Sequence, residues 1–179
     1  MITTIPFLDL HAAYLELKPE IDAAIARVLE SGWYVLGAEV EAFEAEWASY
    51  CNASHSVGVG NGLDALTLAL RALDIGPGDE VIVPSFTFFA SVSCVTRLGA
   101  TPIFADIRPD TFNIDTQHME SLITERTRAI IPVHLFGQCA EIDRICQIAG
   151  QHDVPVIEDA AQAIGAAYHS RPAGSWGLV

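Results

Sequence analysis

Apolar residues in the first fifty positions recur at helical spacing. From residue 13 to residue 30 they fall three or four positions apart, which places them on one face of a helix, at Tyr14, Leu17, Ile21, Ala24, Ile25 and Val28. Ser31-Gly32 ends this pattern, and the aromatic residues Trp33 and Tyr34 follow in a predicted loop. A second amphipathic stripe predicts a helix from Val40 to about Cys51. Residues 1–50 are therefore interpreted as an N-terminal helical segment.

Beyond residue 50 the pattern changes to short apolar runs that alternate with helical segments. The apolar runs predict strands at residues 55–59, 80–84, 101–105, 129–133 and 154–158. The intervening segments predict helices at residues 62–73, 88–98, 116–124 and 141–151, the third of them capped by Asp115. A small hairpin is expected from residue 166, with its turn at residues 170–175. Such repeated units are typical of an α/β fold with a mainly parallel sheet and helices on both faces.

Composition excludes several classes of protein. With 51% hydrophobic and 18% charged residues the chain is not a disordered segment, and its net charge of −14 opposes binding to nucleic acid or to an anionic membrane. No apolar run approaches the roughly 20 residues that cross a bilayer, and no signal peptide is recognisable at the N-terminus. The four cysteines show no CxxC spacing, so they are interpreted as buried small hydrophobic residues in a reducing cytoplasm.

Candidate chemistry gathers where predicted strands end, which is where open α/β sheets bind ligands. The first candidate is the glycine-containing turn at residues 58–65, which leads into a helix near Gly62. Free backbone N–H groups at a helix start favour a phosphate group. The alternative is a tight turn in which the glycines serve geometry and Asn61 or Asp64 caps the helix.

A second candidate, residues 84–90, carries three phenylalanines beside hydroxyl groups. One ring, Phe88 by preference, could stack on a flat cofactor, whereas the alternative places all three rings in the core. A third candidate is His134, just past a strand, where a hydrogen-bonded structural histidine is the alternative to a base or ligand.

The fourth candidate is Asp159 with Gln162, at the end of the last apolar strand. Asp159 could instead cap a helix. Metal binding is not expected, because no HxxE or HxxxH cluster accompanies it. A phosphate cradle, a stacking ring, an acid and an amide at one sheet edge together suit a phosphorylated aromatic cofactor with a basic ring nitrogen. The acid would keep that nitrogen protonated, so that the ring withdraws electrons from a substrate.

Seven stretches, in order along nearly the whole chain, resemble the N-terminal half of the DegT/DnrJ/EryC1/StrS family of sugar aminotransferases. They are residues 5–10 (IPFLDL), 32–37 (GWYVLG), 60–66 (GNGLDAL), 76–81 (GPGDEV), 84–88 (PSFTF), 132–138 (PVHLFGQ) and 158–163 (EDAAQA). The resemblance implies the aspartate aminotransferase-like (type I) fold and pyridoxal 5'-phosphate as cofactor. Residues 51–179 would be the cofactor-binding large domain, incomplete at its C-terminus, and the smaller C-terminal domain would be absent.

The resemblance also implies a role for each site residue. Asp159 would pair with the pyridine nitrogen, Gln162 would hydrogen-bond the phenolic oxygen and Phe88 would stack on the ring. Gly62 and Leu63 would offer backbone N–H groups to the phosphate. Many family members have a small polar residue where Leu63 stands, so a side-chain contact to phosphate is unavailable there. Trp33 and Tyr34 would line the substrate side.

The chain departs from the family in containing a single lysine, Lys18, which lies in no matching motif. In the family the lysine that holds the cofactor as a Schiff base lies shortly past the position of Val179. We therefore expect a fragment without a catalytic residue, inactive alone.

For the full-length protein the resemblance implies a cytoplasmic homodimer that transfers an amino group from a donor such as glutamate to a nucleotide-linked keto sugar. The form of the phosphate turn, Asn61-Gly-Leu-Asp64, is reminiscent of 3-aminotransferases that act on dTDP-linked sugars. Two alternatives stay open. One is a dehydratase of the same fold with histidine in place of the lysine, and the other is an inactive fragment or partner subunit.

Overall fold

A computed structural model describes residues 6–178. The chain divides into two compact units, and the boundary in the sequence lies between Trp47 and Ala48. The N-terminal unit consists of α1 (Leu10–Ser31) and most of α2 (Ala38–Tyr50). The side chain of Asp9 caps α1 by accepting hydrogen bonds from the N–H groups of His11 and Ala12. Gly32 ends it at φ +65°, a left-handed conformation that glycine adopts without steric cost. Both predicted helices are confirmed.

The second unit contains the remaining elements. Its helices are α3 (Gly62–Ala72), α4 (Ala90–Arg97), α5 (Thr116–Ser121) and α6 (Ile142–Gln151), with a 3-10 turn at Leu135–Gly137. Its strands are β1 (Glu80–Pro84), β2 (Thr101–Ala105), β3 (Thr127–Ile130) and the hairpin β4 (Ala167–Tyr168) with β5 (Arg171–Pro172). The predicted bounds of β1 and β2 are confirmed to the residue. The predicted cap on α5 is confirmed too, because Asp115 accepts from the N–H groups of Gln117 and His118.

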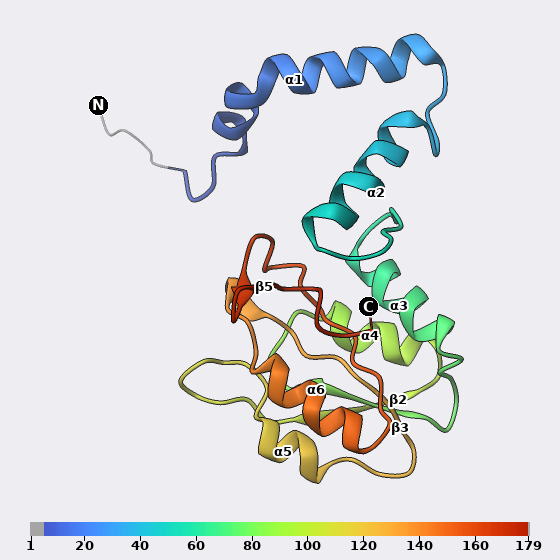
Figure 1. The fold of residues 1–179 in the computed structure, drawn as a ribbon, viewed down its shortest axis with the longest axis vertical. Helices are drawn as coiled ribbons and strands as arrows, with labels where there is room; N and C mark the ends of the chain where they lie inside the picture. The colour runs from blue at the N-terminus through green and yellow to red at the C-terminus, as the bar shows by residue number, and fades with distance from the viewer. Residues whose placement is uncertain (1–5, 179) are drawn as a thin grey trace. The chain divides into compact units, whose positions relative to one another are not determined.

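The sheet is parallel, in the order β2-β1-β3, and helices cover both of its faces (Figure 1). Alternate residues of β1 and β3 enter different cores, as the pleat of a strand requires. Ile82 and Ile130 pack with α5 and α6 in one core. Val81 and Val83 pack with α3 and α4 in the other. This layered arrangement confirms the predicted fold class.

The strand predicted at residues 55–59 is wrong. No strand of the described sheet pairs with this segment, and Val57 is 78% exposed. Alternating apolar residues favour an extended backbone, but a strand also needs a neighbouring strand that accepts and donates hydrogen bonds. The strand predicted at residues 129–133 is β3, which runs from Thr127 to Ile130. It begins earlier than predicted because Thr127 pairs with Glu80, and it ends three residues earlier than predicted. Its polar first residues hid this start in the sequence.

The strand predicted at residues 154–158 is not continuous. Only two isolated parallel pairs form in this region, Ile130 with Val156 and Val133 with Asp159, and they place the segment beside β3. The backbone of Val156 also accepts a hydrogen bond from the N–H of Leu178. The residues that lead to Asp159 are therefore held on both sides, and Asp159 is fixed at the carboxyl end of this part of the sheet.

The cysteines follow their prediction only in part. Cys94 is fully buried, and burial raises the pKa of its thiol to about 11. Cys51, Cys139 and Cys146 are only partly buried. All four are free thiols. In residues 6–178 no helix combines the length and the apolar character that a membrane span requires.

Candidate functional site

Asp159 occupies a fixed position at the end of the strand-like segment beside β3. Its N–H donates to the carbonyl of Pro132 at 2.9 Å, and its own carbonyl accepts from the N–H of His134 at 3.0 Å. Backbone pairing on this side follows from the apolar run before Asp159, which is buried in the sheet. The carboxylate is partly exposed and so remains accessible to a ligand.

The start of α4 reaches this carboxylate. Ser91 Oγ lies 2.8 Å from Asp159 Oδ2, and the N–H of Ala161 lies 3.3 Å from Asp159 Oδ1. Phe88 stands one turn before Ser91 and is 68% exposed. The other two phenylalanines of this segment, Phe86 and Phe89, are 48% and 71% exposed, so none of the three rings is a core residue. The alternative that buried all three is therefore wrong.

Gln162 is held by the loop that follows His134. Its Oε1 accepts a hydrogen bond from the N–H of Phe136 at 2.9 Å. Phe136 itself has φ +55°, an uncommon conformation for a residue with a Cβ, and this hydrogen bond helps to hold it. Because the amide oxygen is engaged, the amide NH2 is the group left to donate to a ligand.

The turn before α3 has the features of a phosphate cradle. Asn61 caps the helix by accepting from the N–H of Asp64 at 2.9 Å, as one of the alternatives for this turn foresaw. The N–H groups of Gly62 and Leu63 have no protein acceptor among the described residues. A Cβ built at Gly62 would meet nothing within 4 Å, so the space in front of the helix start is open. A cap at the third N–H and free N–H groups at the first two are compatible with a bound phosphate.

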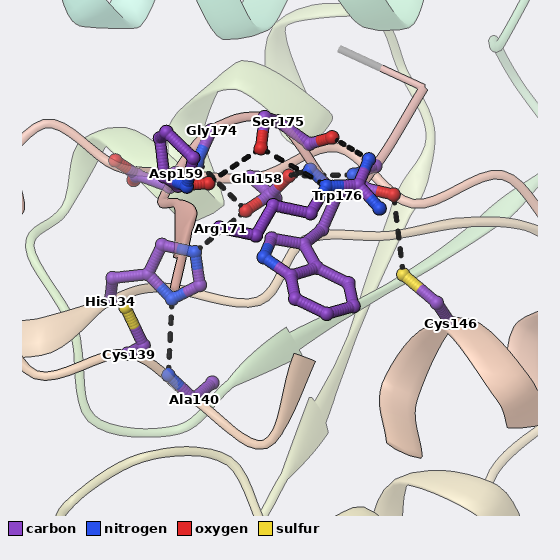
Figure 2. Close-up of polar contacts among 12 residues, drawn as sticks. His134, Cys139, Ala140, Cys146, Glu158, Asp159, Arg171, Gly174, Ser175 and Trp176 are labelled. Atoms are coloured by element: carbon purple, nitrogen blue, oxygen red, sulfur yellow. Dashed lines mark hydrogen bonds and ion pairs between the residues drawn. The ribbon is translucent and has the colours of Figure 1, made fainter. Parts of the chain in front are cut away.

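His134 has a structural role, in agreement with the alternative given for it. Figure 2 shows its ring between the backbone of Ala140 and the carboxylate of Glu158. The N–H of Ala140 donates to Nδ1 at 3.1 Å, so the proton of the neutral ring is on Nε2, which donates to Glu158 Oε2 at 2.9 Å. Both side chains are fully buried. His134 is therefore neither a general base nor a ligand in this arrangement.

Glu158 is a residue that the sequence analysis did not single out. Besides His134, its carboxylate accepts hydrogen bonds from three backbone N–H groups in one loop, those of Gly174, Trp176 and Gly177. Figure 2 shows Gly174 and Trp176 beside this carboxylate. Burial by itself would raise the pKa of Glu158, but these four donors outweigh it and lower the pKa below its ordinary value. The sequence signal that could have indicated this role is the pair of adjacent acids, Glu158 and Asp159, after an apolar run. Neighbouring side chains in an extended segment point in opposite directions, so only one of the two acids can face a ligand.

The remaining predicted site residues lie in the N-terminal unit. Trp33 is 67% and Tyr34 66% exposed, and the Trp33 indole N–H donates to the carbonyl of Val35 at 2.6 Å. Lys18 contacts Tyr14 at 3.0 Å and pairs with Asp22. The hydrogen bond with Asp22 raises the pKa of Lys18, so that its amine stays protonated and is a poor nucleophile.

The structure thus brings Asp159, the Phe88 segment and Gln162 to one edge of the sheet, and α3 with its open start packs against α4. The part of the chain that the structure describes contains no group of three His, Cys, Asp or Glu side chains that could hold a metal ion.

The chain is similar to known transaminases in sequence and in fold. The chain is 55% identical over 175 residues to the dTDP-3-amino-3,4,6-trideoxy-alpha-D-glucose transaminase of Streptomyces venezuelae, covering 98% of the chain and 46% of that protein. The crystal structure of S. venezuelae DesV in complex with a ketimine intermediate matches with a TM-score of 0.94 at 55% identity, over 96% of the chain and 46% of DesV. The PLP-form of the sugar aminotransferase Spr1654 from Streptococcus pneumoniae matches with a TM-score of 0.87 at 34% identity, over 98% of the chain and 47% of that protein.

The chain spans about half the length of these proteins, and its fold is that of the large domain of type I aminotransferases. The model of the DegT/DnrJ/EryC1/StrS aminotransferase family matches residues 16–179. Because this family model covers most of the chain and the relatives are about half identical to it, the chain belongs to the DegT/DnrJ/EryC1/StrS aminotransferase family.

Proposed function

We propose that this chain is the cofactor-binding part of an aminotransferase that acts on a nucleotide-linked keto sugar. Aminotransferases of this family use pyridoxal phosphate. The observation that carries the proposal is the contact between Ser91 and Asp159. It joins a partly exposed carboxylate at a strand end to the segment that presents the Phe88 ring. The amino donor would be glutamate or a similar amino acid.

The residues present fit a phosphorylated pyridine in their chemistry. The open start of α3 offers the N–H groups of Gly62 and Leu63 to the phosphate. Asp159 would hold a proton on the ring nitrogen, and the free NH2 of Gln162 would donate to the phenolic oxygen. Phe88 would stack on one face of the ring. Bound in this way, the cofactor would supply an electron-withdrawing ring for the transfer of an amino group.

The name of the S. venezuelae relative supports a finer proposal for the substrate. It agrees with the form of the Asn61–Asp64 turn in favouring a dTDP-linked 3-keto deoxysugar as acceptor. Trp33 and Tyr34 are proposed to lie on the substrate side, because two exposed aromatic rings can pack against a sugar or a base. The proposal further includes a homodimer in the cytoplasm.

The experiment uses the full-length polypeptide with pyridoxal phosphate, glutamate and a dTDP-linked 3-keto-6-deoxyhexose. The expected products are the 3-amino sugar nucleotide and 2-oxoglutarate, identified by mass spectrometry. A dehydrated sugar without a gain of nitrogen would instead favour the dehydratase. A protein that binds pyridoxal phosphate but converts no keto sugar would contradict the proposed activity. Light scattering of the same sample tests the homodimer.

A further inference from the structure

The buried hydroxyl of Ser91 contacts the acid that is proposed to hold the cofactor. Ser91 is on the first turn of α4 and has no exposed surface, and its Oγ lies 2.8 Å from Asp159 Oδ2. On its other side it lies 3.0 Å from Thr87 Oγ1. The two hydroxyls and the carboxylate therefore form a chain of three polar groups that joins α4 to the sheet edge.

The chemistry of these groups fixes the direction of both hydrogen bonds. An ionised carboxylate can only accept, so Ser91 donates to Asp159. This uses the single proton of the Ser91 hydroxyl, and Thr87 must therefore donate to Ser91 Oγ. Hydrogen bonds in such a chain polarise one another, and those that end on an ionised group are the stronger ones.

The chain of hydroxyls restricts the rotation of the Asp159 side chain. The backbone of Asp159 is already fixed by its pairing with Pro132 and His134. Ser91 holds one carboxylate oxygen, and the N–H of Ala161 holds the other at 3.3 Å. The carboxylate is thus oriented by the protein itself before any ligand binds. A preorganised acceptor loses less freedom on binding than a mobile one.

The same hydrogen bond ties the stacking ring to the acid. The N–H of Ser91 donates to the carbonyl of Phe88 at 3.2 Å, so Phe88 lies one turn away on the same rigid segment. Holding Ser91 against Asp159 therefore also sets the position of the Phe88 backbone relative to the carboxylate. Two groups proposed to contact the cofactor, 71 positions apart in the sequence, are connected through one serine.

We propose that Ser91, supported by Thr87, is a positioning residue that orients Asp159 toward the cofactor and fixes the Phe88 segment beside it. The inference rests on the proposed function, because Asp159 and Phe88 are assigned to pyridoxal phosphate there. Ser91 itself does not need to touch the cofactor. Its loss is expected to affect cofactor binding and the ring nitrogen more than the stability of the fold.

The test compares Ser91→Ala with Ser93→Ala in the full-length protein. Ser93 is a matched control, since it is buried on the same helix and, within residues 6–178, its hydroxyl hydrogen-bonds only the carbonyl of Ala90, at 3.5 Å. The readouts are the Kd for pyridoxal phosphate, from absorbance titration of the apoprotein, and the pH dependence of the bound cofactor's absorbance. Ser91→Ala is expected to raise Kd about tenfold, the effect of one net hydrogen bond, and to shift the pH profile. Ser93→Ala is expected to change neither.

Two further variants grade the effect. Ser91→Cys keeps the size and a weak donor, so its Kd should lie between those of the wild type and Ser91→Ala. If circular dichroism shows that Ser91→Ala does not fold, the Kd of Ser91→Cys is compared with that of Ser93→Ala instead. Thr87→Val should raise Kd less than Ser91→Ala, because it removes only the outer hydroxyl.

The outcomes separate this inference from the proposed function. If the wild type binds pyridoxal phosphate and Ser91→Ala matches Ser93→Ala in both readouts, Ser91 is only a packing residue and the inference is overturned. If the wild-type protein does not bind pyridoxal phosphate, the proposed function fails and takes the inference with it.

Discussion

His134 donates a hydrogen bond from Nε2 to Glu158 Oε2 at 2.9 Å, and neither side chain is exposed to solvent. Glu158, which is held by this hydrogen bond, and the adjacent acid Asp159 therefore have different roles. Glu158 turns into the protein and fastens the loop of Gly174, Trp176 and Gly177, whereas Asp159 faces the edge of the sheet. Since the side chains of neighbouring residues in an extended segment point in opposite directions, one acid becomes structural and the other stays available to a ligand.

Replacement of Glu158 by glutamine should destabilise the full-length protein. A glutamine amide can accept with only one of its two polar atoms, so at least one of the four donors would face an NH2 group. We expect a loss of about 2–4 kcal/mol in the free energy of unfolding at neutral pH. Urea denaturation measures it. Glu125→Gln, at an exposed position, is the control and should stay within about 0.5 kcal/mol of the wild type.

The effect of Glu158 should also depend on pH. Its pKa is lower in the folded state than its ordinary value of 4.5, so the stabilisation is complete above about pH 4.5 and is lost as the pH falls through the folded pKa. The difference in unfolding free energy between the wild type and Glu158→Gln should therefore shrink in acid. A difference that stays constant from pH 7 to pH 3 would contradict an ionised Glu158.

Asp159→Asn should impair turnover far more than folding. Asparagine has nearly the same shape and can still accept from Ser91, but it carries no charge to hold a proton on the pyridine nitrogen. We expect kcat to fall by about a hundredfold or more, with little change in the melting temperature. Steady-state kinetics at saturating cofactor is the measurement. A variant with the wild-type rate would show that the assigned role is wrong.

Gly62→Ala tests the phosphate cradle separately from the fold. A Cβ at Gly62 meets no protein atom within 4 Å, so the stability of the apoprotein should be unchanged or slightly higher. The added methyl group would lie beside the free N–H groups and would crowd a phosphate bound there, so the Kd for pyridoxal phosphate should rise about tenfold. Gly150→Ala, in α6 and equally open, is the matched control. Equal Kd values for the two variants would place the phosphate elsewhere.

The 179-residue polypeptide alone should not catalyse transamination. Its single lysine, Lys18, is paired with Asp22, and this hydrogen bond raises the pKa of its amine. A protonated amine cannot attack a carbonyl carbon. Incubation of the polypeptide with pyridoxal phosphate, glutamate and a nucleotide-linked keto sugar should give no amino sugar. Lys18→Arg should behave identically, and measurable turnover by either polypeptide would refute this prediction.

The sequence by itself determined the fold class and the element on which most candidate site residues lie. Apolar runs that follow a glycine-containing turn placed β1 and β2 to the residue. β1 is buried along its whole length, as a nearly continuous apolar run indicates. The same logic placed Asp159 at a strand end and Gly62 at a helix start. It failed for residues 55–59, where the pattern gives an extended backbone but no neighbouring strand, and at Thr127, whose pairing with Glu80 is a long-range contact.

Only the tertiary structure decided which polar groups face the ligand and which face the protein. The local sequence does not show that Glu158 is structural and that Asp159 is available to a ligand, because Glu158 is held by His134, 24 positions away. It also does not show that Ser91 rather than Ser93 contacts an acid, because the partner of Ser91 is Asp159, 68 positions away. The same holds for His134, whose tautomer is set by the N–H of Ala140 and by Glu158. The spacing of apolar residues indicates which face of an element is buried. Hydrogen bonds between side chains form only when separate elements pack together, so no single stretch of the sequence shows which partners they join.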